Sequence, residues 1–137
     1  MIKKILSTKI SDTQLNVALL ILRVTVGIIM AHHGYTKITH FDEYQGKFVD
    51  FLGLGLSISL MLAIGSELLC SLLLIGGLLT RFALVPLIIT MLVAVFQAHS
   101  GEILGDGEMA FLYLAIYISL LLKGAGAYSV DAFVFKN

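Results

Sequence analysis

Four long apolar runs dominate the pattern of hydrophobic and polar positions along the chain. They cover residues 15–31, 56–79, 82–98 and 109–122. An α-helix needs about 20 residues, at a rise of about 1.5 Å each, to cross a bilayer. The fourth run approaches that length if Glu108 and Lys123 stand at its two ends. The pattern therefore predicts an all-α fold, an integral membrane four-helix bundle, with residues 1–137 as a single four-helix transmembrane domain.

The segment 41–52, between the first and second runs, has a different pattern. Its apolar residues recur at helical spacing, and its charged residues fall on the other side of the helix. The apolar set is Phe41, Tyr44, Phe48, Phe51 and Leu52. The segment is too short and too polar to span a membrane. It predicts a short amphipathic interfacial helix on the outer membrane surface.

Composition supports the membrane class. Hydrophobic residues make up 58% of the chain and charged residues 13%, against about 25% charged residues in a usual soluble domain. The formal net charge is zero and the mean hydropathy is +0.98. These values argue against a soluble enzyme, a disordered chain and a partner that is a nucleic acid. The single cysteine, Cys70, excludes an internal disulfide, a CxxC pair and a cysteine metal cluster.

The distribution of Lys and Arg over the loops predicts the orientation of the bundle. One side would hold six basic residues and the other only Lys37 and Lys47. The first side carries Lys3, Lys4, Lys9, Arg81, Lys123 and Lys136. Both termini are therefore expected in the cytoplasm. Arg23 interrupts the first run and no small-x-small site follows it, so we interpret this run as a span and not as a cleaved signal peptide.

Two ionisable residues lie inside the predicted spans. Arg23 is within the first run and Glu67 is at the middle of the second. Such a side chain costs at least ~2.5–3.5 kcal/mol at the centre of a membrane helix and therefore needs a partner or a function. Antiparallel neighbours would place the two at similar depth, so we expect Arg23 and Glu67 to approach each other. Either they fix helix packing, or they polarise or protonate a bound ligand.

Further titratable residues are expected at the outer ends of three spans. His33 and Lys37 share one face of the first helix, His99 ends the third, and Glu108 opens the fourth. Imidazole titrates near neutrality and carboxylates can hold or pass a proton. The group is a candidate for proton exchange, although polar residues are also common at membrane interfaces. Tyr113 is a candidate ligand-binding residue, with aromatic packing as the alternative.

The histidines also raise the question of a metal or haem site. His32, His33, His99 and Glu102 are suitable ligand types. However, no HxxxH or HExxH spacing is present, and adjacent histidines on a helix point about 100° apart. We therefore expect no metal site and no cofactor held by the chain itself.

Several short motifs, spread from about Leu15 to Asp131, resemble those of the DoxX family of small bacterial membrane proteins. In order they are Arg23-x3-Gly27, His33-Gly34-x2-Lys37, a central Glu67, Gly76-Gly77-Leu-Leu-Thr80-Arg81, His99, Gly107-Glu108 and Gly124-x-Gly126-x-Tyr128-Ser129-x-Asp131. Ser57 departs from the pattern, because many members have Pro after Leu-Gly-Leu. This departure concerns only the entry to the second helix.

The resemblance implies a four-helix protein of the bacterial cytoplasmic (inner) membrane with both termini cytoplasmic. It also implies a redox association, because the family is named for a subunit of thiosulfate:quinone oxidoreductase. Whether this chain is an enzyme is left open by its residues.

Three functional hypotheses follow. The first is a quinone-interacting oxidoreductase subunit, in which Arg23 and Glu67 hold the polar head of a lipid-soluble or small-molecule ligand. The outer His, Lys and Glu residues would handle protons, and a redox-protein partner or bound cofactor would supply electrons. The second is a non-catalytic membrane anchor or assembly partner of a redox complex. The third is a small transporter or lipid-handling protein, which would require a homo-oligomer because four helices make a thin wall.

Overall fold

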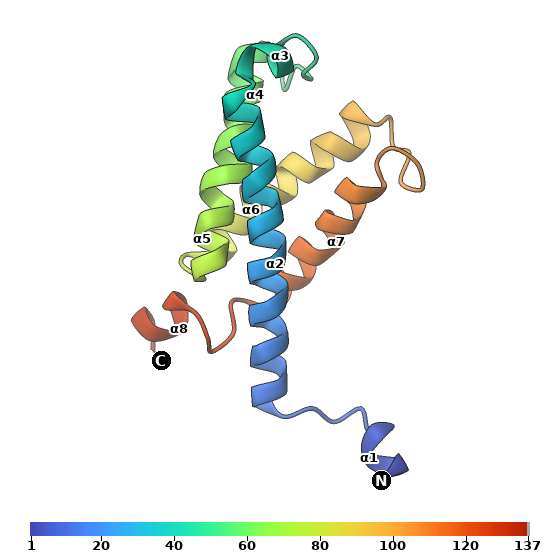
Figure 1. Cartoon of the computed structure of the whole chain (residues 1–137), viewed down its shortest axis with the longest axis vertical. Helices are drawn as coiled ribbons and strands as arrows, with labels where there is room; N and C mark the ends of the chain where they lie inside the picture. The colour runs from blue at the N-terminus through green and yellow to red at the C-terminus, as the bar shows by residue number, and fades with distance from the viewer. Residues whose placement is uncertain (137) are drawn as a thin grey trace.

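A computed structural model describes residues 1–136 of the chain, and over this range the protein is all α. Helices take up 72% of the structure, and the described residues contain no strand. Three helices are long and apolar enough to cross a membrane: Asp12–Thr39, Leu56–Gly76 and Thr80–Ala98. They correspond to the first three apolar runs. Both termini lie in the lower part of Figure 1.

The first long helix is α2, Asp12–Thr39, which follows a short α1, Ile2–Ile5. It begins at a capping box, in which the Ser11 side chain accepts from the Gln14 amide and Gln14 accepts from the Ser11 amide. This reciprocal pairing satisfies two amides that a helix start would leave free. Helix α2 runs through the middle of the molecule from bottom to top in Figure 1.

The second and third long helices are each interrupted by a π-helical segment. The second consists of α4 (Leu56–Ile64), η1 (Gly65–Cys70) and α5 (Ser71–Gly76), and the third of α6 (Thr80–Val93) and η2 (Ala94–Ala98). Gly77 ends α5 in the left-handed conformation, with φ of 68°, which glycine adopts without steric cost. The π-helical turn is rare and is often found at functional sites.

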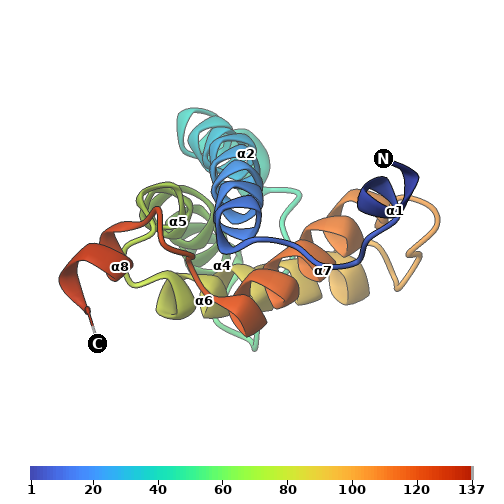
Figure 2. The same ribbon diagram turned by 90° about the horizontal axis from the view of Figure 1, so that it is seen from below.

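Helix α7, Glu108–Lys123, begins and ends at the two residues expected at the ends of the fourth run. With 16 residues it is shorter than the other three. It lies beside α6 in both views of the ribbon (Figures 1 and 2). A last short helix, α8 (Val130–Val134), follows near the lower end of α5.

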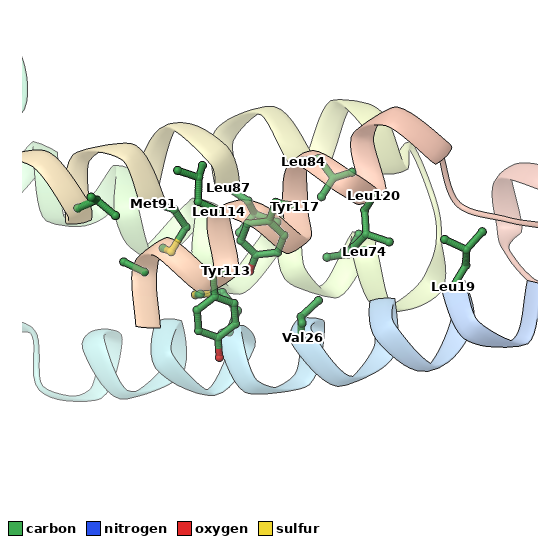
Figure 3. Packing of buried hydrophobic residues seen from close by; sticks show 13 residues of the cluster. Leu19, Val26, Leu74, Leu84, Leu87, Met91, Tyr113, Leu114, Tyr117 and Leu120 are labelled. Carbon is green, nitrogen blue, oxygen red and sulfur yellow. The ribbon is translucent and has the colours of Figure 1, made fainter. Parts of the chain in front are cut away.

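The buried core is apolar and lies between α2, α5, α6 and α7. Figure 3 shows Tyr113 and Tyr117 of α7 among leucines from the neighbouring helices. The two rings stack with their centroids 5.9 Å apart. Small residues of α2 allow close packing on the second helix, since a Cβ at Gly27 would lie 2.5 Å from Cγ1 of Ile75. Gly27 and Gly34 therefore serve helix packing, as small residues do in membrane helices.

The amphipathic helix expected over 41–52 is mostly absent. Helix α3 covers only Phe41–Gln45, and the chain then continues as turns and irregular structure to the start of α4 at Leu56. Leu52, Gly53 and Gly55 all have positive φ, which a helix does not allow. Phe48 and Phe51 consequently leave the expected helical stripe and turn into a cavity described below.

Candidate functional site

A cavity of about 410 Å³ lies at the end of the molecule where α2 finishes. We call it the upper cavity, after its position near α3 in Figure 1. Its walls come from the end of α2, the segment after α3, the second helix around η1, and the third helix up to His99. Most of the lining is apolar, and the cavity is partly open to the outside. Its volume is in the range of small-molecule sites, about 300–1,000 Å³.

A buried ion pair forms part of the wall of the upper cavity. Nζ of Lys37 lies 2.5 Å from both carboxylate oxygens of Glu67. Glu67 is only 3% exposed, and the Lys37 side chain is 18% exposed. Nζ of Lys37 is also 6.0 Å from the ring centroid of Phe48, a distance at which a cation is attracted to an aromatic face. The lysine is therefore held between a carboxylate and an aromatic ring.

The position of Glu67 depends on the close contact of α2 with η1. A Cβ at Gly34 would lie 2.7 Å from the Leu68 amide nitrogen and 3.0 Å from the Glu67 carbonyl carbon. Only glycine permits the two backbones to approach so closely. Lys37 follows Gly34 by about one helical turn, so the same contact brings its ammonium group to the carboxylate.

The second and third helices contribute further polar groups to the cavity. Oγ1 of Thr90 is 2.8 Å from both the Ser66 hydroxyl and the Pro86 carbonyl oxygen. Pro86 has no N–H, and its carbonyl accepts from the threonine. His99 follows η2 directly and is part of the cavity lining.

The expected approach of Arg23 to Glu67 is wrong. Arg23 is 1% exposed, and its guanidinium donates to the carbonyl oxygens of Ala125 and Tyr128, the latter at 2.8 Å. Glu67 packs at the level of Gly34, which lies 11 positions, or about 16 Å of helix, beyond Arg23. The two runs are offset along their axes, so equal positions within the runs do not mean equal depth.

Arg23 belongs instead to a cluster at the lower end of the bundle, which we call the lower clasp: Arg23, Gly77 and the segment 124–131. A Cβ at Gly77 would lie 2.9 Å from Cζ of Arg23, so glycine leaves room for the guanidinium. Asp131 closes the clasp by accepting from the amides of Leu79 and Thr80, at 2.7 and 2.9 Å. It thereby satisfies amides at the start of α6.

The charge state of Asp131 follows from these contacts. Partial burial raises the pKa of this carboxyl, but hydrogen bonds from the amide and hydroxyl of Thr80 and the amide of Leu79, together with the nearby charge of Arg23, lower it by more. The net result is a pKa below the ordinary value, since each of these contacts favours the ionised form.

The predicted site residues are thus divided by the structure. Lys37, Glu67 and His99 line the upper cavity. His33 and Glu108 are exposed on α2 and α7 and are outside the cavity lining. Tyr113 is buried in the core, stacked on Tyr117. Arg23 is in the lower clasp.

The sequence pattern does not indicate every residue of the site. Ser66 and Thr90 are small polar residues within apolar runs, and the hydrogen bond between them gives no periodic signal. The pattern of residues 41–52 predicts Phe48 on the apolar face of an interfacial helix. Asp131 did carry a signal, because it ends the last of the family-like motifs.

The chemistry available at the upper cavity is hydrogen bonding and proton exchange in an apolar setting. Lys37 and the imidazole of His99 can donate a hydrogen bond to an acceptor on a ligand. Glu67 can take up a proton or stabilise a neighbouring cation. Electrostatic interactions are stronger there than in water because the surroundings are apolar. Within residues 1–136, no group of three or more His, Cys, Asp or Glu side chains is placed to hold a metal ion.

Comparison with known proteins agrees with the motifs. The model of the family described as DoxX matches residues 18–100. A Bacillus subtilis protein named "Putative oxidoreductase CatD" is 32% identical over 86% of this chain and 87% of its own length. Two Haemophilus influenzae proteins, both named only "Uncharacterized protein", are similar. They are 34% and 33% identical over 88% and 85% of this chain, and over 85% and 90% of their own lengths. No solved structure matches the chain.

The family match covers Arg23, Lys37, Glu67 and His99. These residues and the close helix contacts at Gly27 and Gly34 lie in the matched region, which also covers most of the first helix able to span a membrane and all of the other two. The chain is therefore a membrane protein that belongs to the DoxX family.

Proposed function

We propose that the upper cavity binds the head of a quinone and that the protein is a quinone-interacting subunit of a membrane oxidoreductase system. The observation that carries this proposal is the buried Lys37–Glu67 pair on the wall of a largely apolar cavity of about 410 Å³. Such a pair is costly to bury. The pair faces a cavity and not packed side chains, and this favours a role in binding a ligand.

The residues present fit a quinone. A quinone head is flat and apolar, with carbonyl oxygens that accept hydrogen bonds, and its tail is soluble in lipid. Lys37 and His99 are donors on the cavity wall, while Phe48, Leu62 and Val93 are among its apolar lining. When bound, the quinone supplies the electron-accepting chemistry.

The chain's own residues would hold and move protons. Lys37 would orient the head, Glu67 would stabilise the lysine charge or hold a proton, and His99 would exchange protons with the outside. Electrons would come from a redox-protein partner or a further bound cofactor. The name of the Bacillus subtilis relative, an oxidoreductase, is consistent with this role.

The proposal includes a topology. Helix α7, flanked by Glu108 and Lys123, would be the fourth span and complete a four-helix bundle. Both termini would face the cytoplasm of a bacterium, and the upper cavity would face the outer side of the cytoplasmic membrane. The excess of Lys and Arg at the lower end supports this orientation.

Quinone binding to the purified full chain tests the proposal. Native mass spectrometry and thermal unfolding in mild detergent would be measured with a short-chain ubiquinone and with menadione. A bound adduct and a rise in the unfolding temperature are expected, because a ligand that binds only the folded state stabilises it by about 2.7 kcal/mol at 100 times its Kd.

Matched variants locate the binding. Glu67→Gln and His99→Asn should lower quinone affinity at least tenfold. Glu108→Gln and His33→Asn make the same chemical changes on residues outside the cavity and should leave affinity unchanged. Absence of binding to the folded wild-type protein, or equal effects of both sets of variants, would reject the quinone site and favour the anchor or assembly role.

A further inference from the structure

A second cavity, of about 320 Å³, lies at the lower end of the bundle beside the clasp. Its lining includes Thr80 and Arg81 from the start of α6, Lys123 from the end of α7, and Phe135 after α8. We call it the basic pocket. It is open to the outside, and it is separate from the upper cavity, with which it shares no lining residue.

The two cations of the basic pocket come from different helices and converge on the same place. A Cβ at Gly124 would lie 3.4 Å from Nη2 of Arg81, so the guanidinium reaches across to the residue that directly follows Lys123. Gly124 has a φ of 89°, a conformation that favours glycine. Neither Arg81 nor Lys123 takes part in a salt bridge within residues 1–136.

The one carboxylate in the lining does not neutralise these cations by direct contact. Both oxygens of Asp131 accept from backbone amides of Leu79 and Thr80. The hydroxyl of Thr80 is buried beside this carboxylate, and the residue is 1% exposed. The pocket thus contains two cations without a salt-bridge partner among the described residues, a set that suits an anion with several oxygens such as a phosphate.

Exposed apolar side chains lie next to the two cations in sequence, and another lines the pocket. Phe82 and Leu122, the neighbours of the two cations in sequence, are each 78% exposed, and Phe135 is 59% exposed. In a chain with membrane-spanning helices, side chains of this kind contact lipid. An occupant would therefore meet cations at one end and apolar surface at the other.

We propose that the basic pocket binds the phosphate headgroup of an anionic membrane lipid, with Arg81 and Lys123 on the phosphate and the acyl chains along Phe82, Leu122 and Phe135. Basic pockets at the cytoplasmic ends of membrane helices bind such headgroups. The inference is independent of quinone binding, because it rests on the opposite end of the molecule.

Native mass spectrometry of the full chain in detergent tests this proposal. The delipidated protein would be titrated with phosphatidylglycerol, with phosphatidylethanolamine of the same acyl chains, and with phosphatidylglycerol in the presence of millimolar inorganic phosphate. We expect preferential binding of phosphatidylglycerol. Equal binding of both lipids, or full displacement by inorganic phosphate, would overturn the assignment, the second result by showing a site for a free anion.

Two double variants separate a built pocket from general surface charge. Arg81→Gln/Lys123→Gln should weaken phosphatidylglycerol binding about 10- to 30-fold, since each basic residue near a headgroup contributes about a fivefold factor. Lys3→Gln/Lys4→Gln removes the same charge from the exposed α1 and should have no comparable effect. Equal losses in both would reject the pocket.

A third variant covers the case in which the first double variant does not fold. Phe135→Ser changes an exposed side chain outside the core. It should weaken binding of the long-chain lipid severalfold and leave that of a short-chain dihexanoyl phosphatidylglycerol unchanged. Unchanged binding of both lipids would contradict the proposed path of the acyl chains.

Discussion

The two buried charges of the bundle, Arg23 and Glu67, are held in opposite ways. Arg23 is bound by backbone carbonyls of the segment after α7, and packed chain fills the space around it. Glu67 is bound by a flexible lysine, and the pair faces a cavity. Both residues are almost fully buried, so burial alone does not distinguish them. The surroundings of each charge distinguish the two residues. Packed chain around Arg23 indicates a structural role, and the cavity beside Glu67 indicates a role in ligand binding.

The largest expected effect is the loss of stability when Arg23 is replaced. Arg23→Gln should lower the free energy of unfolding by about 3–5 kcal/mol, because it removes two charge-assisted hydrogen bonds, to the carbonyl oxygens of Ala125 and Tyr128. Thermal unfolding in detergent, followed by circular dichroism, measures this loss. Quinone affinity of the fraction that remains folded should not change; a loss of affinity without a loss of stability would reverse the roles assigned to Arg23 and Glu67.

The close contact between α2 and η1 provides the next test. Gly34→Ala places a Cβ against the backbone at Glu67 and Leu68 and should cost about 1–3 kcal/mol. It should also weaken quinone binding, since it moves Lys37 away from Glu67. Gly65→Ala is the control, because a Cβ there meets nothing within 4 Å. Gly65→Ala should be neutral or slightly stabilising. An equal loss of stability in Gly34→Ala and Gly65→Ala would show that the contact between α2 and η1 is not critical.

The ion pair itself should contribute less to stability than the clasp. Glu67→Gln should cost about 2 kcal/mol, below the 3–5 kcal/mol of a fully buried broken pair, because Lys37 retains partial exposure. The double variant Lys37→Met/Glu67→Met should recover most of this stability, as apolar replacements of buried pairs often do. It should still fail to bind quinone. Recovery of binding together with stability would assign the pair to packing alone.

The smallest effect is expected at Asp131. Its folded-state pKa is lowered, so the carboxylate stabilises the protein above the unfolded pKa of about 3.9, and this contribution is lost as pH falls through the folded pKa. Asp131→Asn should cost about 1 kcal/mol at pH 7, the usual contribution of a capping carboxylate. It should also flatten the loss of stability below about pH 4. Unfolding temperatures measured between pH 7 and pH 3 give both the cost at pH 7 and the loss of stability in acid. If the variant lost stability in acid as the wild type does, the role assigned to Asp131 would be contradicted.

The sequence predicts the large features well because the bilayer sets them. The lengths of α2, Leu56–Gly76 and Thr80–Ala98 follow from apolar runs that are long enough to span. The bounds of α7 were recognisable from Glu108 and Lys123. The order of apolar and charged residues along the chain is enough to predict these features.

The pairing of side chains was not predictable in the same way. Arg23 and Glu67 are near the middle of their runs, but the axial offset between helices depends on where backbones can touch, and here Gly34 sets it. The irregular structure of the segment after α3 was also not predictable. A few apolar residues at helical spacing do not form a helix where Leu52, Gly53 and Gly55 need positive φ.

The two π-helical segments have a consequence for experiments that scan the chain one residue at a time. A π turn takes up about one more residue than an α turn, so side chains before and after it fall out of phase by about 100°. A periodic labelling pattern recorded along Leu56–Gly76 should therefore break between Gly65 and Cys70 and resume with a shifted face. A wheel diagram drawn through the whole span would place the positions on one side of that break about 100° away from their true faces.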